Sequence, residues 1–177
     1  MKPLGLTFAL HATDRGFGYV AFEGPFTPFD WGNVYAKGDK NAVCLKRVEA
    51  MLDRFQPETL LLEAYGKGTS LRSDRIARLY RAMIGLAASR GVSVTIYSRA
   101  DIKAAFRTVG ASTRQEIALA VARHVDAFRH RLPRPRKPWE SEDRRMALFN
   151  AGALVLTHFR LGAEGLFDDL SRPPGAS

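Results

Sequence analysis

The sequence has few of the features that mark secreted and membrane proteins. It contains one cysteine, Cys44, which rules out an internal disulfide and fits a reducing compartment. No apolar run approaches the roughly 20 residues that a helix needs to cross a bilayer. The N-terminus passes from a single lysine directly into a strand pattern, which does not resemble a signal peptide. We therefore expect a cytoplasmic protein with no membrane span.

Negative charge is also in short supply. The 177 residues include 18 Asp and Glu against 27 Lys and Arg, which gives a formal net charge of +9. Such a field favours a polyanionic partner, nucleic acid first and an anionic membrane second. A hydrophobic content of 46% with 25% charged residues is typical of a globular protein, and the length suits one full domain.

The spacing of apolar residues predicts one mixed α/β domain. Three strands at 4–11, 17–22 and 30–36, separated by turn residues, predict an antiparallel meander. Helices and strands then alternate, which predicts parallel crossovers in the second half. We expect a domain over 1–162 and a partly disordered tail over 163–177. Further strands are predicted at 58–63 and 92–97, and helices at 40–55, 70–90, 99–107, 112–128 (capped by Ser112) and 141–160.

The stretch Thr59–Glu63 predicts a buried strand that ends on a carboxylate. Its three consecutive leucines indicate a strand covered on both faces. Ligand sites in open α/β sheets lie beyond the carboxyl ends of the strands. An acid at that place is costly to desolvate unless it is paired or holds a cation. Glu63 is therefore the first candidate site residue, and an ordinary solvated strand end is the alternative.

Basic residues flank this strand end on both sides. Residues 129–137 hold five Arg or Lys residues and several prolines, so this segment is expected to stay extended and to follow a phosphate backbone. A solvated basic loop is the alternative. The helix predicted after residue 70 adds arginines at every third position, beside the loop that carries Lys67. The candidate phosphate-binding residues are Lys67, Arg72, Arg75, Lys103, Arg114, Arg134, Arg136 and Lys137.

The predicted last helix offers further oxygen ligands. Glu140 and Glu142 are expected in its first turn, where carboxylates favour the helix dipole. Asp143 and Asn150 share one stripe of this helix, which we expect to face the sheet edge near Glu63. Hydrolysis by a two-metal centre needs several convergent oxygen ligands for Mg²⁺ or Mn²⁺. The candidate metal ligands are Glu63, Asp143 and Asn150, together with His11 and Asp14 from the first strand and the turn after it.

Five segments in this order resemble motifs of the RuvC family of Holliday junction resolvases, within the ribonuclease H-like superfamily. The resemblance covers roughly residues 4–160 and is one of pattern. Residues 11–19, HATDRGFGY, are similar to the family's first hairpin, Asp-Pro-Gly-x-Arg-x-x-Gly-Tyr. The other segments are Leu61–Glu63, similar to its strand glutamate; Tyr97-Ser98 with Ile102-Lys103, similar to Tyr-x-Pro-x-x-Val-Lys; Gly110–Ile117, similar to Gly-x-Ala-x-Lys-x-Gln-Val; and Asn150–Leu154, similar to its last-helix motif Asp-Ala-Leu-Ala.

The resemblance implies Mg²⁺-dependent nicking of DNA junctions by a dimer, with four acidic ligands. Of the matching positions, this chain keeps only Glu63 as an acid. The first-strand aspartate aligns with His11, or with Ala9 if the hairpin register shifts by two. The final aspartate aligns with Asn150, and the ligand one turn before it aligns with Ala147. A histidine suits Mn²⁺ better than Mg²⁺, and a neutral core histidine is the alternative interpretation of His11.

Three hypotheses follow from these observations. The first is a structure-selective DNA endonuclease with a modified Mg²⁺ or Mn²⁺ site, in which Glu63 and Asp143 are catalytic. The second is a non-catalytic protein that binds branched DNA on the same fold. The third is a ribonuclease H-like protein that acts on RNA. The expected partner is branched or duplex DNA, with RNA in its place under the third hypothesis, and the helix at 70–90 is the candidate interface of a homodimer.

Overall fold

A five-stranded mixed sheet forms the centre of the computed structural model, which describes residues 5–25, 27–65 and 71–171, with side chains at 5–25, 27–65 and 74–161. The strand order is β3-β2-β1-β4-β5. β1, β2 and β3 pair antiparallel, and β1, β4 and β5 pair parallel. The predicted meander followed by parallel crossovers is therefore confirmed. The strands are β1 (Leu6–Ala12), β2 (Gly16–Glu23), β3 (Thr27–Tyr35), β4 (Thr59–Glu63) and β5 (Ser93–Tyr97).

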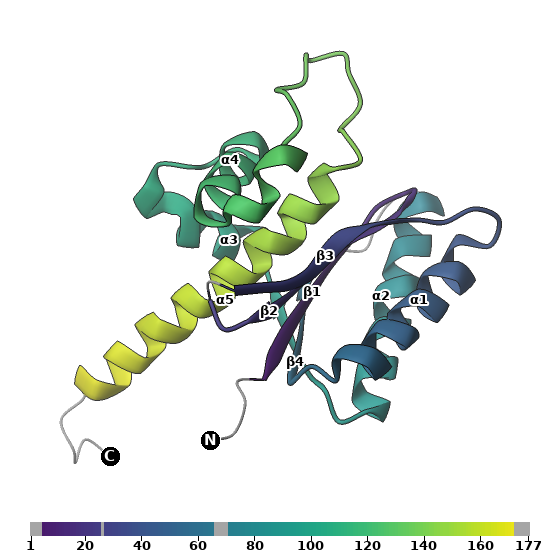
Figure 1. Ribbon diagram of the computed structural model, residues 1–177, viewed down its shortest axis with the longest axis horizontal. Helices are drawn as coiled ribbons and strands as arrows, with labels where there is room; N and C mark the ends of the chain where they lie inside the picture. The colour runs from purple at the N-terminus through teal and green to yellow at the C-terminus, as the bar shows by residue number, and fades with distance from the viewer. Residues whose placement is uncertain (1–4, 26, 66–70, 172–177) are drawn as a thin grey trace.

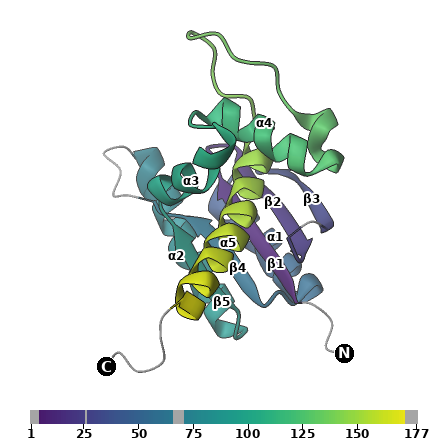
Figure 2. The ribbon, with the colours of Figure 1, turned by 90° about the vertical axis from the view of Figure 1, so that its left-hand side faces the viewer.

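Helices cover both faces of the sheet (Figure 1). The helices α1 and α2 pack on one face, and α3, α4 and α5 pack on the other, with α5 running across the sheet (Figure 2). In the part of the chain that the structure describes, no helix has both the length and the apolar character needed to span a membrane. The helices are α1 (Lys40–Phe55), α2 (Leu71–Ser89), α3 (Arg99–Phe106), α4 (Arg114–His124) and α5 (Met146–Ser171), with short 3₁₀ turns η1 (Arg107–Val109) and η2 (Asp126–Arg131).

The alternation of side chains along β1 and β4 decides which face each residue serves. Ala9 and Leu61 pack under α5 in one core cluster, and their neighbours in sequence pack under α1 and α2 in the other. All three leucines of β4 are fully buried, which confirms a strand covered on both faces. His11 and Glu63 lie two positions further along the same two strands. Both side chains therefore face the α5 side, at the edge where the strands end.

The strand register also settles which residue of β1 stands beside Glu63. Ala9 pairs with Leu61 inside the core, and β1 runs parallel to β4. The next residue of β1 on the same face is His11, and its ring reaches the Glu63 carboxylate. The alternative register, in which Ala9 takes this place, is wrong because Ala9 lies one step deeper in the core.

The position of α5 over the sheet depends on Gly18 in β2. A Cβ atom built on Gly18 would overlap with the backbone of Ala147 in the first turn of α5. Only a residue without a side chain lets the helix approach the strand this closely. This close approach fixes where α5 begins, next to the ends of β1 and β4.

The start of α5 differs from the prediction. The helix begins at Met146 rather than near residue 141, so Glu140, Glu142 and Asp143 precede it and its first turn holds no acid. The predicted role of Glu140 and Glu142 at the helix dipole is therefore wrong. The helix runs to Ser171, past the predicted end at residue 160, so the predicted domain boundary at 162 falls within α5.

Two smaller differences concern α4 and α2. Thr113, not Ser112, is the N-cap of α4, because its hydroxyl accepts a hydrogen bond from the backbone N–H of Glu116. The apolar face of α2 is buried against the sheet of its own chain, with Leu79 and Met83 fully covered. Core packing therefore accounts for these positions, and the homodimer stays a prediction.

Candidate functional site at the carboxyl edge of the sheet

A cavity of about 800 Å³ opens at the edge of the sheet where β1 and β4 end. Five segments form its walls: the end of β1 with the turn after it, the end of β4 with the residues after it, α2, the start of α4, and the segment that leads into α5. This is the edge at which open α/β sheets place their ligands. The charged and titratable residues around it are His11, Asp14, Arg15, Glu63, Tyr65, Tyr80, Arg114, Glu142, Asp143 and Arg144.

Glu63 lies at the base of this cavity between two nitrogen-bearing side chains. One carboxylate oxygen is 3.5 Å from Nδ1 of His11, and the other is 3.7 Å from a terminal nitrogen of Arg114. Only 11% of the Glu63 side chain is exposed. The structure therefore pairs this acid with basic groups, and the interpretation as an ordinary solvated strand end is wrong.

Electrostatics at Glu63 favour the charged form. Burial on its own would raise the pKa of Glu63, but the contact with His11 and the charges of Arg114 and Arg99 outweigh burial and lower it. The pKa of Arg99 is itself lowered by burial and by the neighbouring charge of Arg114. Glu63 thus holds together a cluster of like-charged groups that would otherwise repel one another.

The partners of Glu63 are incompletely hydrogen-bonded. Among the described residues, Nδ1 of His11 and one terminal nitrogen of Arg114 are buried without a hydrogen-bond partner. At 3.5 Å and 3.7 Å the contacts with Glu63 are long for hydrogen bonds. A buried polar group that lacks a partner costs about 1–3 kcal/mol. The floor of the cavity therefore offers nitrogen atoms that an oxygen-rich anion would satisfy.

Tyr80 supports the floor of the cavity from α2. Its hydroxyl accepts a hydrogen bond of 2.9 Å from the backbone N–H of Ala12, at the end of β1. Burial raises the pKa of Tyr80 far above its ordinary value, so the phenol stays protonated. Tyr80 fixes the backbone next to His11, and its ring also contacts that of Tyr65, which is partly exposed.

Asp143 lines the same cavity, but its carboxylate is already engaged. The guanidinium of Arg145 donates two hydrogen bonds to it, of 3.0 and 2.8 Å, and the backbone N–H of Arg145 donates a third. These contacts lower the pKa of Asp143. The predicted second carboxylate, Asp143, therefore lies at the same edge of the sheet as Glu63, but it is bound by Arg145.

The remaining predicted ligands divide between the cavity and the core. Asp14 lines the cavity in the turn after β1, and its backbone carbonyl accepts a hydrogen bond of 2.6 Å from Lys40. Asn150 is 6% exposed within α5 and does not belong to the cavity wall. The predicted stripe of α5 is thus buried, and Asp143 precedes the helix instead of sharing its face with Asn150.

The described residues do not fit a metal centre of the kind that the fold suggests. Nowhere in the described ranges do three or more His, Cys, Asp or Glu side chains stand close enough to hold a metal ion. The oxygens of Glu63 face His11 and Arg114, and those of Asp143 face Arg145. Mg²⁺ and Mn²⁺ require several convergent oxygen ligands. The structure gathers four of the five predicted ligands around one cavity without arranging them as a coordination shell.

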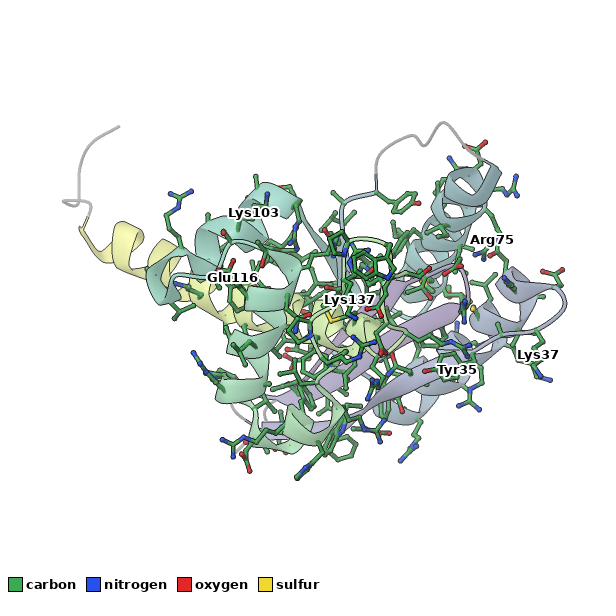
Figure 3. All side chains as sticks on the ribbon, turned by 90° about the horizontal axis from the view of Figure 1, so that it is seen from above. Tyr35, Lys37, Arg75, Lys103, Glu116 and Lys137 are labelled. Atoms are coloured by element: carbon green, nitrogen blue, oxygen red, sulfur yellow. The ribbon has the colours of Figure 1, made fainter. Side chains whose placement is uncertain are left out.

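The predicted phosphate-binding residues do not form one surface. In the view of Figure 3, Lys103 and Arg75 lie on opposite sides with Lys137 between them. Arg75 is structural, because its guanidinium donates to the side chain of Asn41 at 2.9 Å and to the carbonyl of Thr13 at 3.3 Å. Lys103 and Lys137 are exposed, and Arg114 lies in the cavity wall. Lys67 and the side chain of Arg72 lie outside the described residues.

Arg99 is a site residue that the sequence interpretation missed. It follows Ser98 at the end of β5, and β5 runs parallel to β4 next to Glu63. Since parallel strands end at the same edge of a sheet, a basic residue directly after β5 was a readable signal. Arg99 adds positive charge to a cluster that already holds Arg114 and His11.

Three solved structures share the arrangement of these elements. T. thermophilus RuvC in complex with a Holliday junction substrate matches with a TM-score of 0.69 and 19% identity, over 91% of this chain and 96% of that chain. A second structure, of Thermus thermophilus RuvC, matches with a TM-score of 0.61 and 21% identity, over 89% of this chain and 96% of that chain. The yeast mitochondrial Holliday junction resolvase Ydc2 matches with a TM-score of 0.51 and 11% identity, over 94% of this chain and 85% of that chain. No family profile and no curated protein sequence matches the chain.

The likeness concerns the whole domain, from the antiparallel meander to the long helix that crosses the sheet. At these identities it establishes the arrangement of the backbone, and it assigns no role to individual side chains. The fold predicted from the five sequence motifs is confirmed. This chain therefore has a RuvC-like, ribonuclease H-like fold.

Proposed function

We propose that this chain binds branched DNA, four-way junctions above all, and that it does so without metal-dependent cleavage. The observation that carries the proposal is the environment of Glu63, whose two oxygens face His11 and Arg114 instead of further acids. The fold supports DNA as the partner, because one matching RuvC structure is a complex with a Holliday junction substrate. The net charge of +9 supports a polyanion independently of the fold.

The cavity suits a phosphate group better than a cation. Its buried donors on His11 and Arg114 are short of acceptors, and a phosphate supplies several strong acceptor oxygens. Arg15 and Arg144 stand at the wall of the same cavity. Glu63 keeps Arg114 and Arg99 close together despite their like charges. In this proposal Glu63 positions the arginines, and the arginines bind the DNA backbone at the branch.

The first test compares a labelled four-way junction with a duplex of the same arm sequences at the same salt concentration. We expect junction binding about tenfold tighter than duplex binding or better, in EDTA and in Mg²⁺ alike, with no strand cleavage. Equal affinity for the two DNAs would contradict the proposal. Arg114→Ala is expected to weaken junction binding, with exposed Arg123→Ala in the last turn of the same helix as the matched control.

The second candidate is a metal-dependent endonuclease that acts on branched DNA. It is favoured by one observation: Glu63, His11, Asp14 and Asp143 line the same cavity although they come from three separate segments of the chain. Cleavage in Mg²⁺ or Mn²⁺ that disappears in Glu63→Gln would establish this candidate and overturn the binding-only proposal. An RNA–DNA hybrid in the same assay tests the third hypothesis, that of action on RNA.

A further inference from the structure

The segment between η2 and α5, residues 132–145, extends away from the body of the protein (Figures 1 and 2). It contains Trp139, whose side chain is 78% exposed. No other large hydrophobic side chain that the structure describes is as exposed. Tryptophan is the side chain with the largest apolar surface to shield from water, so its display at the end of a basic loop calls for a physical reason.

The loop around Trp139 is built around one carboxylate. The side chain of Glu140 accepts hydrogen bonds from Arg134 at 2.8 Å and from the backbone N–H of Lys137 at 3.0 Å. Its carbonyl accepts one from Arg136 at 2.9 Å, and its N–H donates to the carbonyl of Lys137 at 3.0 Å. These bonds close a tight turn over Pro138 and Trp139. The turn that presents the tryptophan is therefore held in place while the ring itself stays uncovered by the core.

The carboxylate of Glu140, which closes this turn, is charged at neutral pH. The hydrogen bonds from Arg134 and from the backbone of Lys137 lower the pKa of Glu140. Three prolines between residues 133 and 138 further restrict the backbone of the segment. Little conformational entropy is then lost when the loop meets a partner. A preformed loop therefore binds its partner more tightly than a flexible loop that makes the same contacts.

The surroundings of the ring identify the kind of partner. The ammonium of Lys137 lies 5.5 Å from the centre of the Trp139 ring, and Arg136 flanks it in sequence. An exposed aromatic ring among cations matches the two parts of a nucleotide, because the ring stacks on the base and the cations contact the phosphate. An apolar protein partner would gain nothing from the cation that lies beside the indole.

Branched DNA differs from duplex DNA in that it exposes base faces on which a tryptophan can stack. Inside a duplex every base already stacks on its neighbours, so an inserted ring must first separate them. At a branch point the last base pair of an arm, or an unpaired base, exposes a face. Base stacking on an aromatic side chain is worth about 10- to 100-fold in affinity or more. The cations of the loop contribute to binding of both DNAs, whereas the ring contributes at the branch.

We propose that Trp139 recognises the branch point by stacking on an exposed base, and that the turn closed by Glu140 holds the ring ready for this contact. The proposal rests on the proposed function, because it names the side chain that gives binding its preference for branched DNA. It adds a contact remote from the cavity at Glu63, on a part of the chain that the sequence interpretation treated only as a source of positive charge.

Affinity measurements on matched DNAs test the proposal. Trp139→Ala is expected to lower junction affinity about tenfold or more while duplex affinity changes less than about twofold. Trp139→Phe, which keeps a ring, is expected to recover most of the loss. The matched control is Phe29→Ala, which removes another exposed aromatic side chain, 54% exposed on β3, and is expected to leave the preference for junctions intact.

Fluorescence gives an independent readout. The chain has two tryptophans, and Trp31 packs against Phe128 in the core cluster under α5. Stacking on a base is expected to quench Trp139 emission when junction DNA is added, and the quenching is expected to be absent in Trp139→Ala. A junction with 2-aminopurine beside the branch is expected to report the same contact from the DNA side.

The outcomes separate this inference from the proposed function. If wild type prefers junctions and Trp139→Ala prefers them equally, stacking by Trp139 is wrong and the proposed function stands. If Trp139→Ala weakens duplex and junction binding by the same factor, Trp139 is a general contact and the inference is overturned. If wild type shows no preference for junctions, the proposed function itself fails.

Discussion

Glu63 and Glu140 are two carboxylates that lie near arginines and differ in burial and in the length of their contacts. The side chain of Glu63 is 11% exposed, with its nearest nitrogens at 3.5 and 3.7 Å. The side chain of Glu140 is 30% exposed and accepts hydrogen bonds of 2.8 and 3.0 Å. The buried carboxylate thus has the long contacts, and the more exposed one has the short contacts.

The comparison separates a structural carboxylate from a functional one. Glu140 accepts short hydrogen bonds from its partners, and these bonds hold the turn closed. Among the described residues, His11 and Arg114 each keep one buried nitrogen that lacks a hydrogen bond within normal distance, although Nδ1 of His11 faces Glu63 at 3.5 Å. A folded protein rarely leaves such donors unpaired without a reason. We infer that the residues around Glu63 bind a ligand, and that the hydrogen bonds of Glu140 serve only to stabilise the turn.

The largest expected effect comes from the contact that places α5 beside Glu63. In Gly18→Ala the new methyl group overlaps with the backbone of Ala147, so the start of α5 must move. We expect a loss of about 3 kcal/mol in the free energy of unfolding, measured by urea denaturation. The matched control is Gly85→Ala in α2, where a Cβ meets nothing within 4 Å. That change is expected to stabilise the protein by up to about 1 kcal/mol.

The second expected effect concerns the charge of Glu63. Glu63→Gln removes the negative charge that holds Arg99 and Arg114 near each other, and we expect a loss of about 2 kcal/mol at neutral pH. Because folding lowers the pKa of Glu63, its stabilising contribution is present above the ordinary pKa of a free glutamate. That contribution is lost as the pH falls through the folded-state pKa.

Denaturation curves across pH check the sign of this effect. The gap between wild type and Glu63→Gln is expected to narrow as the pH falls from about 6 to about 3. Glu142→Gln, which removes an exposed carboxylate from the same cavity, serves as the control and is expected to show a smaller loss at every pH. A gap that widens towards acid would mean that Glu63 is not stabilised in its charged form.

The fold and the position of Glu63 were within reach of the sequence for a simple reason. The mostly apolar run of β1 and the leucine run of β4 are local patterns, and they report burial directly. The carboxyl edge follows from the parallel pairing that these strands adopt. Glu63 was found because it combines a strand pattern with a charge at its end, and both features are visible in five consecutive residues.

The rest of the site depends on contacts between distant residues. The spacing of arginines on α2 predicts one basic side, but only the fold shows that Asn41 and the carbonyl of Thr13 hold Arg75. The pairing of Asp143 with Arg145 is local by contrast, and the helix-like pattern of the acids before α5 concealed it. An arginine that distant residues hold looks as free in a sequence as one that binds DNA, because tertiary packing decides which residues meet.

A third prediction separates the basic residues that serve the fold from those that serve DNA. Arg75→Ala is expected to cost about 1 kcal/mol of stability, because it removes the two side-chain hydrogen bonds that join α2 to Asn41 of α1 and to the turn after β1. It is expected to leave the salt dependence of DNA binding unchanged. Lys103→Ala is expected to do the opposite, with unchanged stability and a salt slope reduced by about 1. Equal salt slopes for the two variants would remove Lys103 from the DNA contact.

The smallest effect on stability is expected from a substitution of Glu140. Glu140→Gln keeps the shape of the side chain and loses its charge, so the hydrogen bond from Arg134 weakens. Since the loop stands apart from the core, the midpoint of thermal unfolding is expected to stay within error of wild type. The turn itself is expected to open more often, and limited proteolysis with trypsin is expected to cut faster after Arg136, since the Arg134–Pro135 bond resists trypsin.

The same variant shows why a brace that adds little stability can still matter for binding. If the ring of Trp139 is presented by the turn, loosening the turn restores the entropy that preorganisation had removed. Junction affinity is then expected to fall about threefold with duplex affinity unchanged, a smaller loss than in Trp139→Ala because the ring is still present. Glu116→Gln, which alters a carboxylate that is hydrogen-bonded to Thr113 and not to the turn at Trp139, is the control. A Glu140→Gln protein with faster cleavage and full junction preference would show that the order of the turn and the action of the ring are independent.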